Sequence, residues 1–514
     1  MAAARPIAVV LDGPPTPAWQ ARALAGLEAS AAVDVVELRL AGRPRRGVAR
    51  RLHTAVERHI FGLGADPYTP TRVAPYEARE SPATLVVWLS ERPLPYNEPR
   101  ELLSLRHGGV LEPAEDAFRR AVLSGGAHVE SEVLLRREGV TVLVARTVSG
   151  VRPFSETLSR TLALWKLAAV VPRALERLPG LDLLAPAPAR VGPPPSTAAL
   201  LARAARSWLR VLLTRLLFRR PWSIRVRERA AAPTRGWERE DGLVRWGAAR
   251  TYADPFLFEH EGRHHLFCEE VPLDGKRGVI SHTELRLDGI PADPPTPVLR
   301  APWHLSYPFL FAHEGEIFMI PESSATRRVE LYRAVAFPHT WEREAILLDE
   351  IDAVDATVLA HDGRLWLFAG VAAAGASSAD ELHLFWADTP CGPWRPHLRN
   401  PVVSDVRCAR PAGAIQRWGT RIVRPGQDCS RRYGGAISFR EIELLNPTAY
   451  AEHEIERLEP ADVGEARATH TYAADGRFEA IDLRRRELRL RRRIAWSGRG
   501  LWPHLPGRRA RRRG

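Results

Sequence analysis

The feature that most constrains this chain is a hairpin unit that is repeated in its second half. The first copy runs from Ala253 to Phe267, where a small or acidic residue opens an apolar run, a glycine turn follows, and a second apolar run closes the unit. Similar units follow at regular intervals. Their turn glycines are Gly262, Gly315, Gly363, Gly419 and Gly476, spaced by 53, 48, 56 and 57 residues.

Each unit predicts a β-hairpin, because glycine in an Asp-Gly or Glu-Gly turn adopts positive φ without a steric penalty. A hairpin alone cannot bury its apolar face, so a period near 50 residues predicts blades that cover one another around an axis. Five copies predict an all-β, five-bladed propeller over residues 222–493, with residues 222–226 as an outer strand. The alternative is a β-sandwich with similar hairpins, which the shared register of three copies disfavours.

The N-terminal part of the chain has a different pattern. Residues 7–11, 33–40 and 84–89 have the composition of buried strands, and residues 17–31 that of a helix. This alternation predicts an α/β domain of Rossmann type with a parallel sheet over residues 1–178. The glycine-rich phosphate fingerprint is absent, since Pro14 and Pro15 lack the N–H donors that a phosphate cradle needs. We therefore expect no cofactor.

Residues 179–221 predict a connector between the two domains. A stretch rich in proline and glycine, residues 179–195, cannot sustain a helix and predicts a linker. A strongly apolar helix from Thr197 to Arg220 follows, with Leu212 and Leu216 on one face and arginines on another. Such a basic amphipathic helix can lie on a membrane surface. A helix that packs the two domains together is an equally supported alternative.

The formal net charge of +13 is concentrated at the C-terminus. Residues 484–514 hold thirteen arginines and one glutamate, a net charge of +12, which leaves +1 for the rest. Residues 494–514 therefore predict a basic tail with an affinity for anionic surfaces, and we expect no specific nucleic-acid partner.

The cysteines and the N-terminus predict the compartment. The four cysteines lack the spacing of a metal site or a disulfide framework, so we expect no metal. No apolar run is long enough to span a bilayer, and the chain starts directly with a strand pattern rather than a signal peptide. These features predict a cytoplasmic protein, with peripheral contact to the inner membrane face through the connector helix and the tail.

The segment Ser104-Leu105-Arg106-His107-Gly108-Gly109 and the element order around it resemble the formyltransferase-like domain of methionyl-tRNA formyltransferases and sugar N-formyltransferases. In that family an Asn-x-His segment and a later Asp act on the formyl group of a folate donor. The resemblance implies that His107 holds the position of the family's histidine. Leu105 replaces the asparagine, and from Gly139 onward, where the family continues toward its Asp, no carboxylate occurs before Glu156. A degenerate, non-formylating domain is therefore favoured over an active one.

The repeat predicts which side chains meet at the propeller axis. Eight residues before the turn glycine the first three copies hold Asp254, Tyr307 and Asp355, and Glu322 lies seven residues after the second turn. Carboxylates from different blades can work as an acid and base pair. We expect Asp254 to be the base or nucleophile, Glu322 the acid, and Asp355 the orienting carboxylate. The other predicted substrate contacts are Tyr307, His304, Arg410, Gln427, Asp428, Arg432 and His470, with Arg410 and Arg432 as anchors for an acidic group.

The motif Ala253-Asp254-Pro255 and the repeat layout resemble five-bladed propeller glycosidases of the arabinanase and invertase type, in which a blade-one Asp is the base or nucleophile. A closer resemblance is to the N-terminal propeller domain of the plant glucosamine inositolphosphorylceramide transferase family. It rests on several motifs. They include Trp303-His304-Leu305-Ser306-Tyr307-Pro308, Ile320-Pro321-Glu322-Ser323-Ser324, Arg410-Pro411-Ala412-Gly413 and Gln427-Asp428-Cys429-Ser430-Arg431-Arg432-Tyr433-Gly434-Gly435.

These patterns predict a protein that acts on a glycan or sugar phosphate through the propeller, by glycoside hydrolysis or glycosyl transfer. In the plant family the glycosyltransferase domain follows the propeller, and no segment of that length follows here, so the plant activity is not carried over. A non-catalytic sugar-binding propeller and an amino-sugar N-formyltransferase are the alternatives. Acids about 5 to 10 Å apart across an open pocket would indicate catalysis, whereas salt-bridged or scattered acids would indicate binding.

Overall fold

The computed structural model describes residues 4–42, 48–61, 64–74, 82–92, 101–110, 113–178, 186, 196–230, 233–237, 243–244, 246, 250–272 and 277–488. The chain divides into two compact units, one built mainly from Met1–Leu212 and the other from Leu213–Ala372 and Ser378–Arg492. Nearly all of the expected linker 179–195 and the expected tail 494–514 lie outside the described residues. Among the described helices, none combines the length and hydrophobicity that a bilayer-spanning segment requires.

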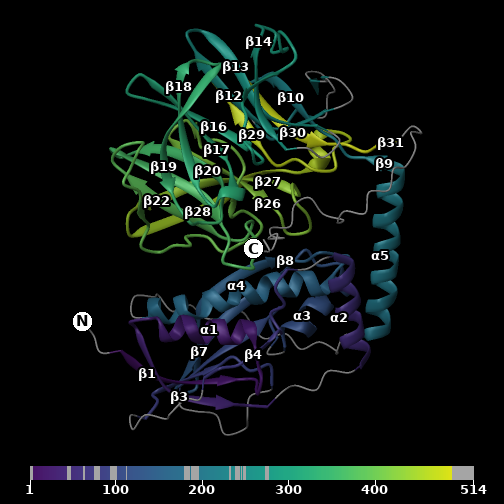
Figure 1. Ribbon diagram of the computed structural model, residues 1–514, viewed down its shortest axis with the longest axis vertical. Helices are drawn as coiled ribbons and strands as arrows, with labels where there is room; N and C mark the ends of the chain where they lie inside the picture. Colours follow the sequence, from purple (N-terminus) through teal and green to yellow (C-terminus); the bar gives the residue numbers. More distant parts are fainter. Residues whose placement is uncertain are drawn as a thin grey trace, which may run out of the picture. The chain divides into compact units, whose positions relative to one another are not determined.

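The first unit contains a mixed six-stranded sheet in the order β3-β1-β5-β6-β7-β8 (Figure 1). The first four of these are parallel, and β7 and β8 form an antiparallel hairpin that extends the sheet. The predicted α/β architecture is thus confirmed, but the expected parallel sheet was wrong for its last two strands. The strands are β1 (Arg5–Leu11), β3 (Val33–Leu40), β5 (Leu85–Trp88), β6 (Glu101–His107), β7 (His128–Arg137) and β8 (Val140–Gly150).

Helices accompany this sheet, together with a small pair formed by β2 (Thr16–Pro17) and β4 (Pro70–Thr71). Helix α4 starts where Ser155 caps it, because the Ser155 hydroxyl accepts from the backbone N–H of Leu158 at 3.0 Å. Its apolar face, including Leu164 and Leu167, joins the core formed with the sheet. The helices are α1 (Ala18–Glu28), α2 (Val48–Phe61), α3 (Ala114–Ser124), α4 (Glu156–Arg177) and α5 (Thr197–Leu217).

The second unit is a ring of five antiparallel sheets, which confirms the predicted five-bladed propeller. Blade one is β12 (Arg250–His260), β13 (Arg263–Pro272), β14 (Val279–Leu285) and β15 (Thr296–Leu299). Blade two is β16 (Ser306–His313), β17 (Glu316–Glu322), β18 (Val329–Ala336) and β19 (Thr340–Leu348). Blade three is β20 (Ala353–His361), β21 (Arg364–Val371), β22 (Leu382–Ala387) and β23 (Arg395–Pro396). Blade four is β24 (Arg410–Pro411), β25 (Gln416–Trp418), β26 (Arg421–Asp428), β27 (Ala436–Asn446) and β28 (Ala449–Leu458).

The fifth blade closes the ring with strands from both ends of the unit. Its strands are β29 (Tyr472–Ala474), β30 (Phe478–Arg484), β10 (Trp222–Glu228) and β11 (Leu243–Val244), and β10 pairs with β30 along its whole length. The expected strand at residues 222–226 is thus confirmed, as the third strand of this blade, with β11 outside it. The first strands of neighbouring blades contact one another around the axis, and Tyr472 N–H donates to Ala412 O at 2.8 Å between blades five and four. A short pair, β9 (Phe218–Arg219) with β31 (Glu487–Leu488), lies outside the blades.

Candidate functional site

The first strands of blades one, two and three share one irregularity at the same place. Each strand loses regular pairing there, and the residue at the irregularity has positive φ: 49° at Asp254, 46° at Tyr307 and 53° at Asp355. Positive φ is unfavourable for residues other than glycine, so three equivalent cases indicate a conformation that the surrounding fold enforces. The conformation turns these three side chains away from the regular strand register.

Asp254 is buried in a network with the fifth blade. Its carboxylate accepts from the Thr471 hydroxyl at 2.7 Å and from Tyr307 N–H at 3.2 Å, and its Oδ1 lies 2.9 Å from His470 Nε2. Burial acts to raise the pKa of Asp254, but His470 and Thr471 outweigh burial and hold the pKa below its ordinary value. Asp254 is therefore an ionised carboxylate paired with an imidazolium.

His470 lies between two aspartates. Its Nδ1 lies 2.8 Å from Oδ2 of Asp482, a β30 residue that the repeat pattern does not single out. Burial alone would lower the pKa of His470, but Asp482 and Asp254 raise it to about 10. His470 was expected to contact substrate, yet only 2% of its side chain is exposed. The structure makes it the counter-ion of Asp254.

Asp355 forms the second buried ion pair. Arg410 donates to it from Nε at 2.6 Å and from Nη2 at 3.2 Å, and Gln427 donates at 3.1 Å. Burial acts to raise the pKa of Asp355 and the charge of Arg410 opposes it; because two guanidinium nitrogens contact the carboxylate, we assign an ion pair. Arg410 was expected to anchor an acidic group of the substrate, and here its guanidinium contacts the protein's own acid instead.

Tyr307 and Gln427 are fully buried and link the blades. The Tyr307 hydroxyl accepts from Gly413 N–H at 2.8 Å and lies 2.9 Å from the Thr357 hydroxyl, so it joins blades two, three and four. Gln427 also donates to Pro411 O at 2.9 Å. Both residues were expected to contact substrate, but at 0% exposure they hold the network that positions the central acids.

Glu322 and His304 lie at the solvent-facing border of this network. Glu322 lies 3.5 Å from Arg410 and its side chain is 12% exposed. His304 is 40% exposed, accepts from Gly278 N–H at its Nδ1, and has its Nε2 2.9 Å from Glu269. Burial raises the pKa of Glu269. Both Glu322 and His304 are more accessible to a ligand than Asp254, Asp355 or Tyr307.

The remaining predicted contacts are Asp428, the last residue of β26, and Arg432, on the loop that follows. Asp428 pairs with Arg457 and accepts from Ser430 N–H at 2.8 Å, so its carboxylate is occupied. Arg432 is exposed, and within the described residues it has no hydrogen bond or ion pair. Tyr433, which was not among the predicted contacts, lies under the Arg410 guanidinium at 5.1 Å from its ring centroid.

His107, the candidate of the N-terminal domain, lies on β6 in the other unit. Its Nδ1 is 2.9 Å from the Ser131 hydroxyl, and burial lowers the pKa of the ring to about 4. The imidazole is thus neutral at physiological pH. This contact orients the ring through a hydroxyl rather than through a carboxylate.

Two groups of buried side chains have the composition of a metal site. In the propeller, Asp254, His470 and Asp482 have ligand atoms within 4.8 Å of one another. A protonated imidazole cannot bind a cation, and both Asp482 oxygens already accept backbone N–H groups, at 2.8 Å and 3.1 Å from His470 and Thr471 and at 3.2 Å from Asp254. This group is a hydrogen-bonded ion cluster.

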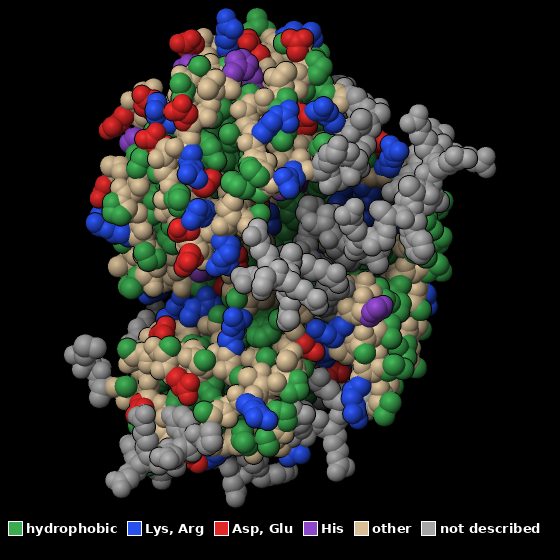
Figure 2. All heavy atoms as spheres, in the orientation of Figure 1, with side chains coloured by type: hydrophobic (Ala, Val, Ile, Leu, Met, Phe, Trp, Pro, Cys, Tyr) green, Lys and Arg blue, Asp and Glu red, His purple; other side chains and the backbone are tan. Residues whose placement is uncertain are grey.

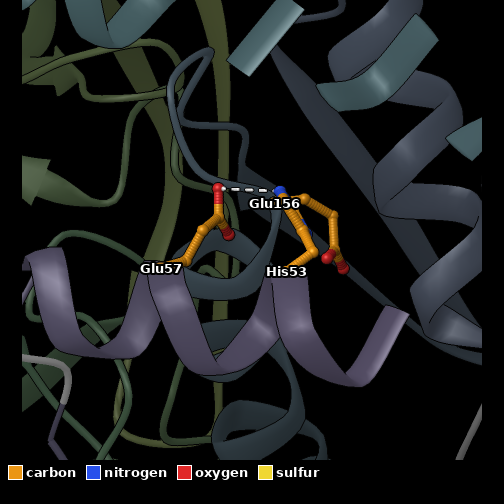
Figure 3. A group of neighbouring side chains, drawn as sticks. All are labelled: His53, Glu57 and Glu156. Carbon is orange, nitrogen blue, oxygen red and sulfur yellow. Dashed lines mark ion pairs between the residues drawn. The ribbon is translucent and has the colours of Figure 1, made fainter. Parts of the chain in front are cut away.

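The second group is His53, Glu57 and Glu156 in the N-terminal unit. Figure 3 shows His53 and Glu57 on one helix, with Glu156 beside them, and His53 Nε2 lies 3.5 Å from Glu57 Oε1. Two guanidiniums already oppose the charge of Glu156: Arg160 lies 3.4 Å from it, and the charge of Arg119 also acts on it. Burial raises the pKa of Glu156 to about 7, which lowers the negative charge further.

We therefore expect this group to bind no metal. Adding Zn²⁺ or a chelator to the full chain should shift its unfolding temperature by less than ~1 °C, because a ligand that does not bind the folded state does not stabilise it. Differential scanning calorimetry measures the shift. A Zn²⁺-dependent rise of several degrees that His53→Gln removes, and that the exposed His59→Gln on the same helix keeps, would contradict this expectation.

Part of the chain is similar in sequence to known proteins. Residues 246–485 match the family model "Glucosamine inositolphosphorylceramide transferase 1, N-terminal". The match covers blades one to four and strands β29 and β30 of the fifth blade, and it contains all the central acids described above. The N-terminal unit lies outside it.

The protein named glucosamine inositolphosphorylceramide transferase 1 from Arabidopsis thaliana is 35% identical over 206 residues, which cover 40% of this chain and 27% of the relative. The protein of the same name from Oryza sativa subsp. japonica is 34% identical over 203 residues, 39% of this chain and 27% of the relative. The aligned part thus spans about a quarter of each plant protein.

The solved structures that are similar to this chain include glycoside hydrolases. Zg3597, a family 117 glycoside hydrolase from Zobellia galactanivorans, has 11% identity and a TM-score of 0.33, covering 50% of this chain and 90% of that one. A putative glycoside hydrolase from Parabacteroides distasonis has 11% identity and a TM-score of 0.34, with 49% and 92% covered. At these values we draw no conclusion about chemistry.

Proposed function

We propose that the propeller recognises a carbohydrate, a sugar or a sugar phosphate, at the end of its axis bordered by Glu322, His304 and Arg432. The support for a carbohydrate is the family match over residues 246–485 and the plant relatives, whose name specifies glucosamine and an inositol phosphoryl lipid. The whole activity of those proteins is not implied, because the match covers 27% of their length.

One observation favours recognition over hydrolysis: both central acids are ion-paired. Asp254 is paired with His470 and Asp355 with Arg410, and the two aspartate side chains are 6% and 3% exposed. Acid and base catalysis needs one protonated and one free carboxyl group within reach of the substrate. Glu322 has partial exposure but lies 3.5 Å from Arg410, so each of the three predicted catalytic acids has a cationic partner.

Glycoside hydrolysis or transfer is the second candidate, and one observation favours it. Asp254 and Asp355 occupy equivalent positions with positive φ, and backbone strain of this kind accumulates at functional sites. In this mechanism Asp254 is the base or nucleophile, Glu322 the acid and Asp355 the orienting carboxylate. Substrate binding would have to release Asp254 from His470 before the chemical step.

The recognition proposal predicts that Glu322→Gln weakens sugar binding. A hydrogen bond to a charged group contributes about 1.5–3 kcal/mol, so the dissociation constant should rise roughly 10- to 100-fold. Isothermal titration calorimetry with glucosamine, inositol phosphate and nucleotide sugars measures it, with the exposed Glu344→Gln of the same blade as control. Failure of the wild-type chain to bind any of these ligands would refute recognition.

An activity assay separates the two candidates. Reducing-sugar release from oligosaccharides, or sugar transfer between the same ligands, should be absent from the wild-type chain if the site only binds. Turnover that Asp254→Asn abolishes, while circular dichroism shows an intact fold, would overturn recognition in favour of catalysis.

For the N-terminal unit we propose a degenerate formyltransferase-like domain. The support is the sequence at His107 and its environment, in which Leu105 replaces asparagine and Ser131 is the partner of the ring. Adding a folate should not raise the unfolding temperature of the chain. A folate-dependent rise that His107→Ala removes would indicate an active formyltransferase instead.

A further inference from the structure

Helix α5 exposes a continuous row of leucines. The row is spaced by three and four residues, so its members share one face of the helix. Each is about half exposed, and Figure 2 shows hydrophobic side chains along the edge where Figure 1 draws α5. The exposed fractions are 56% at Leu209, 52% at Leu212, 46% at Leu213, 50% at Leu216 and 52% at Leu217.

A different face of α5 holds it to the N-terminal unit. Leu200 and Ala204 are 1% and 4% exposed, the Trp208 indole donates to Phe154 O at 2.8 Å, and Ser207 contacts Pro153 O. The leucine row is therefore not the packing face of the helix. Five half-exposed leucines on one helix form an apolar surface of the kind that marks an interaction site.

The charge of the helix is entirely positive. Residues Thr197–Leu217 contain four arginines and no acidic residue, and Arg206 and Arg210 are exposed at the edge of the leucine row. Exposed Arg219 and Arg220 follow the helix. Partial burial of the Arg220 guanidinium lowers its pKa, and the positive charges of Arg486, Arg215 and Arg432 lower the pKa further, so positive charge gathers where the helix ends.

We propose that α5 lies in the plane of an anionic lipid surface, with the leucine row in the acyl layer and the arginines at the lipid phosphates. A second copy of this helix would bring like charges together, which is unfavourable. A nucleic acid would pair with the arginines but leave the leucines in water. A bilayer surface with anionic headgroups matches both the apolar row and the positive edge.

This site does not depend on the carbohydrate proposal, because it is carried by different residues. The two connect in one respect: Arg432, the exposed arginine of the propeller site, is among the charges that act on Arg220. The end of α5 and the bordering residues of the propeller site thus share one positive region. Docking of α5 would bring that region close to lipid headgroups.

The test is flotation of the full chain with phosphatidylcholine vesicles, with and without phosphatidylglycerol. Binding should require the anionic lipid and weaken with salt. Combining Leu209→Gln, Leu213→Gln and Leu216→Gln should lower the partition coefficient by at least about 100-fold. Each substitution removes the favourable free energy of transferring a leucine side chain from water into the acyl layer. Combining Arg206→Gln and Arg210→Gln should lower it by roughly 30-fold.

The matched control is Leu287→Gln with Leu398→Gln, which are 71% and 75% exposed on the propeller and should leave binding unchanged. Circular dichroism and the unfolding temperature verify that all variants fold. All variants keep the arginine-rich C-terminal residues, so persistent binding of the triple leucine variant would assign binding to them and overturn the proposal. No binding by the wild-type chain, or a light-scattering mass showing dimers that the leucine variant dissolves, would overturn it as well.

Discussion

Replacing Gly413 with alanine is expected to destabilise the propeller by about 4 kcal/mol or more. An alanine Cβ at this position would lie 1.9 Å from the backbone oxygen of Tyr472, and the φ of 129° is unfavourable for any residue with a side chain. Neither atom in the clash is the end of a flexible side chain. Moving the segment would also break the bonds from Gly413 N–H to Tyr307 and from Tyr472 N–H to Ala412.

Urea denaturation monitored by tryptophan fluorescence measures the loss. Gly419→Ala, in the same blade, is the control: its φ is also positive, at 63°, but nothing lies within 4 Å of the added Cβ. It should cost only about 1 kcal/mol. Similar losses for both variants would show that backbone conformation alone, rather than the close approach of blades four and five, determines the effect.

The second large effect is a fall in propeller stability between pH 6.5 and about 10, caused by His470. The folded state raises the pKa of this ring from 6.5 to about 10, so the folded protein keeps a proton that the unfolded chain releases. The resulting stabilisation is fully present below pH 6.5 and is lost as the pH rises through the folded-state value. A shift of this size corresponds to a contribution of about 5 kcal/mol.

His470→Gln should remove this pH dependence. At about pH 6 it should destabilise the propeller strongly, because Asp254 and Asp482 lose the cation between them, whereas at about pH 10 the difference from wild type should shrink. The half-exposed His453→Gln serves as control. A constant difference between wild type and His470→Gln across this range would mean that His470 is not protonated in the folded protein.

Much of the propeller could be predicted because its information is local. The turn glycines and the apolar runs define each hairpin, and the spacing of the repeat alone places Asp254, Tyr307 and Asp355 at equivalent positions. The ion-pair and hydrogen-bond partners of these residues are harder to predict from the sequence. Asp482 meets His470 only because β30 pairs with β29 in one register, and a shift by one residue would place it on the other face.

The roles of the aligned residues depend on burial, which the repeat does not encode. Tyr307 and Gln427 are polar and lie near the axis, as expected for substrate contacts, but the structure satisfies their polar groups inside the protein. Arg410 illustrates the same point, because the sequence is the same whether its guanidinium is free to bind substrate or is the counter-ion of Asp355. The distinction is set by which blades are neighbours.

Helix α2 shows where the usual pattern fails. Its buried face carries His53 and Glu57, while Val48, Leu52 and Val56 are 76%, 65% and 38% exposed. An apolar periodicity therefore points to the wrong side of this helix, because the buried positions take part in an ion network with Arg119 and Arg160. For this reason the sequence pattern does not predict the helix.

The closing of the ring by β10 and β30 has a consequence for biosynthesis. Ile224 pairs with Asp482, 258 positions later, so β10 leaves the ribosome long before its partner exists. Contacts this distant in sequence slow folding, and a strand with a free edge is prone to aggregate until its partner is synthesised. Nascent chains stalled before β30 should therefore depend on chaperones, even though four blades have already been synthesised.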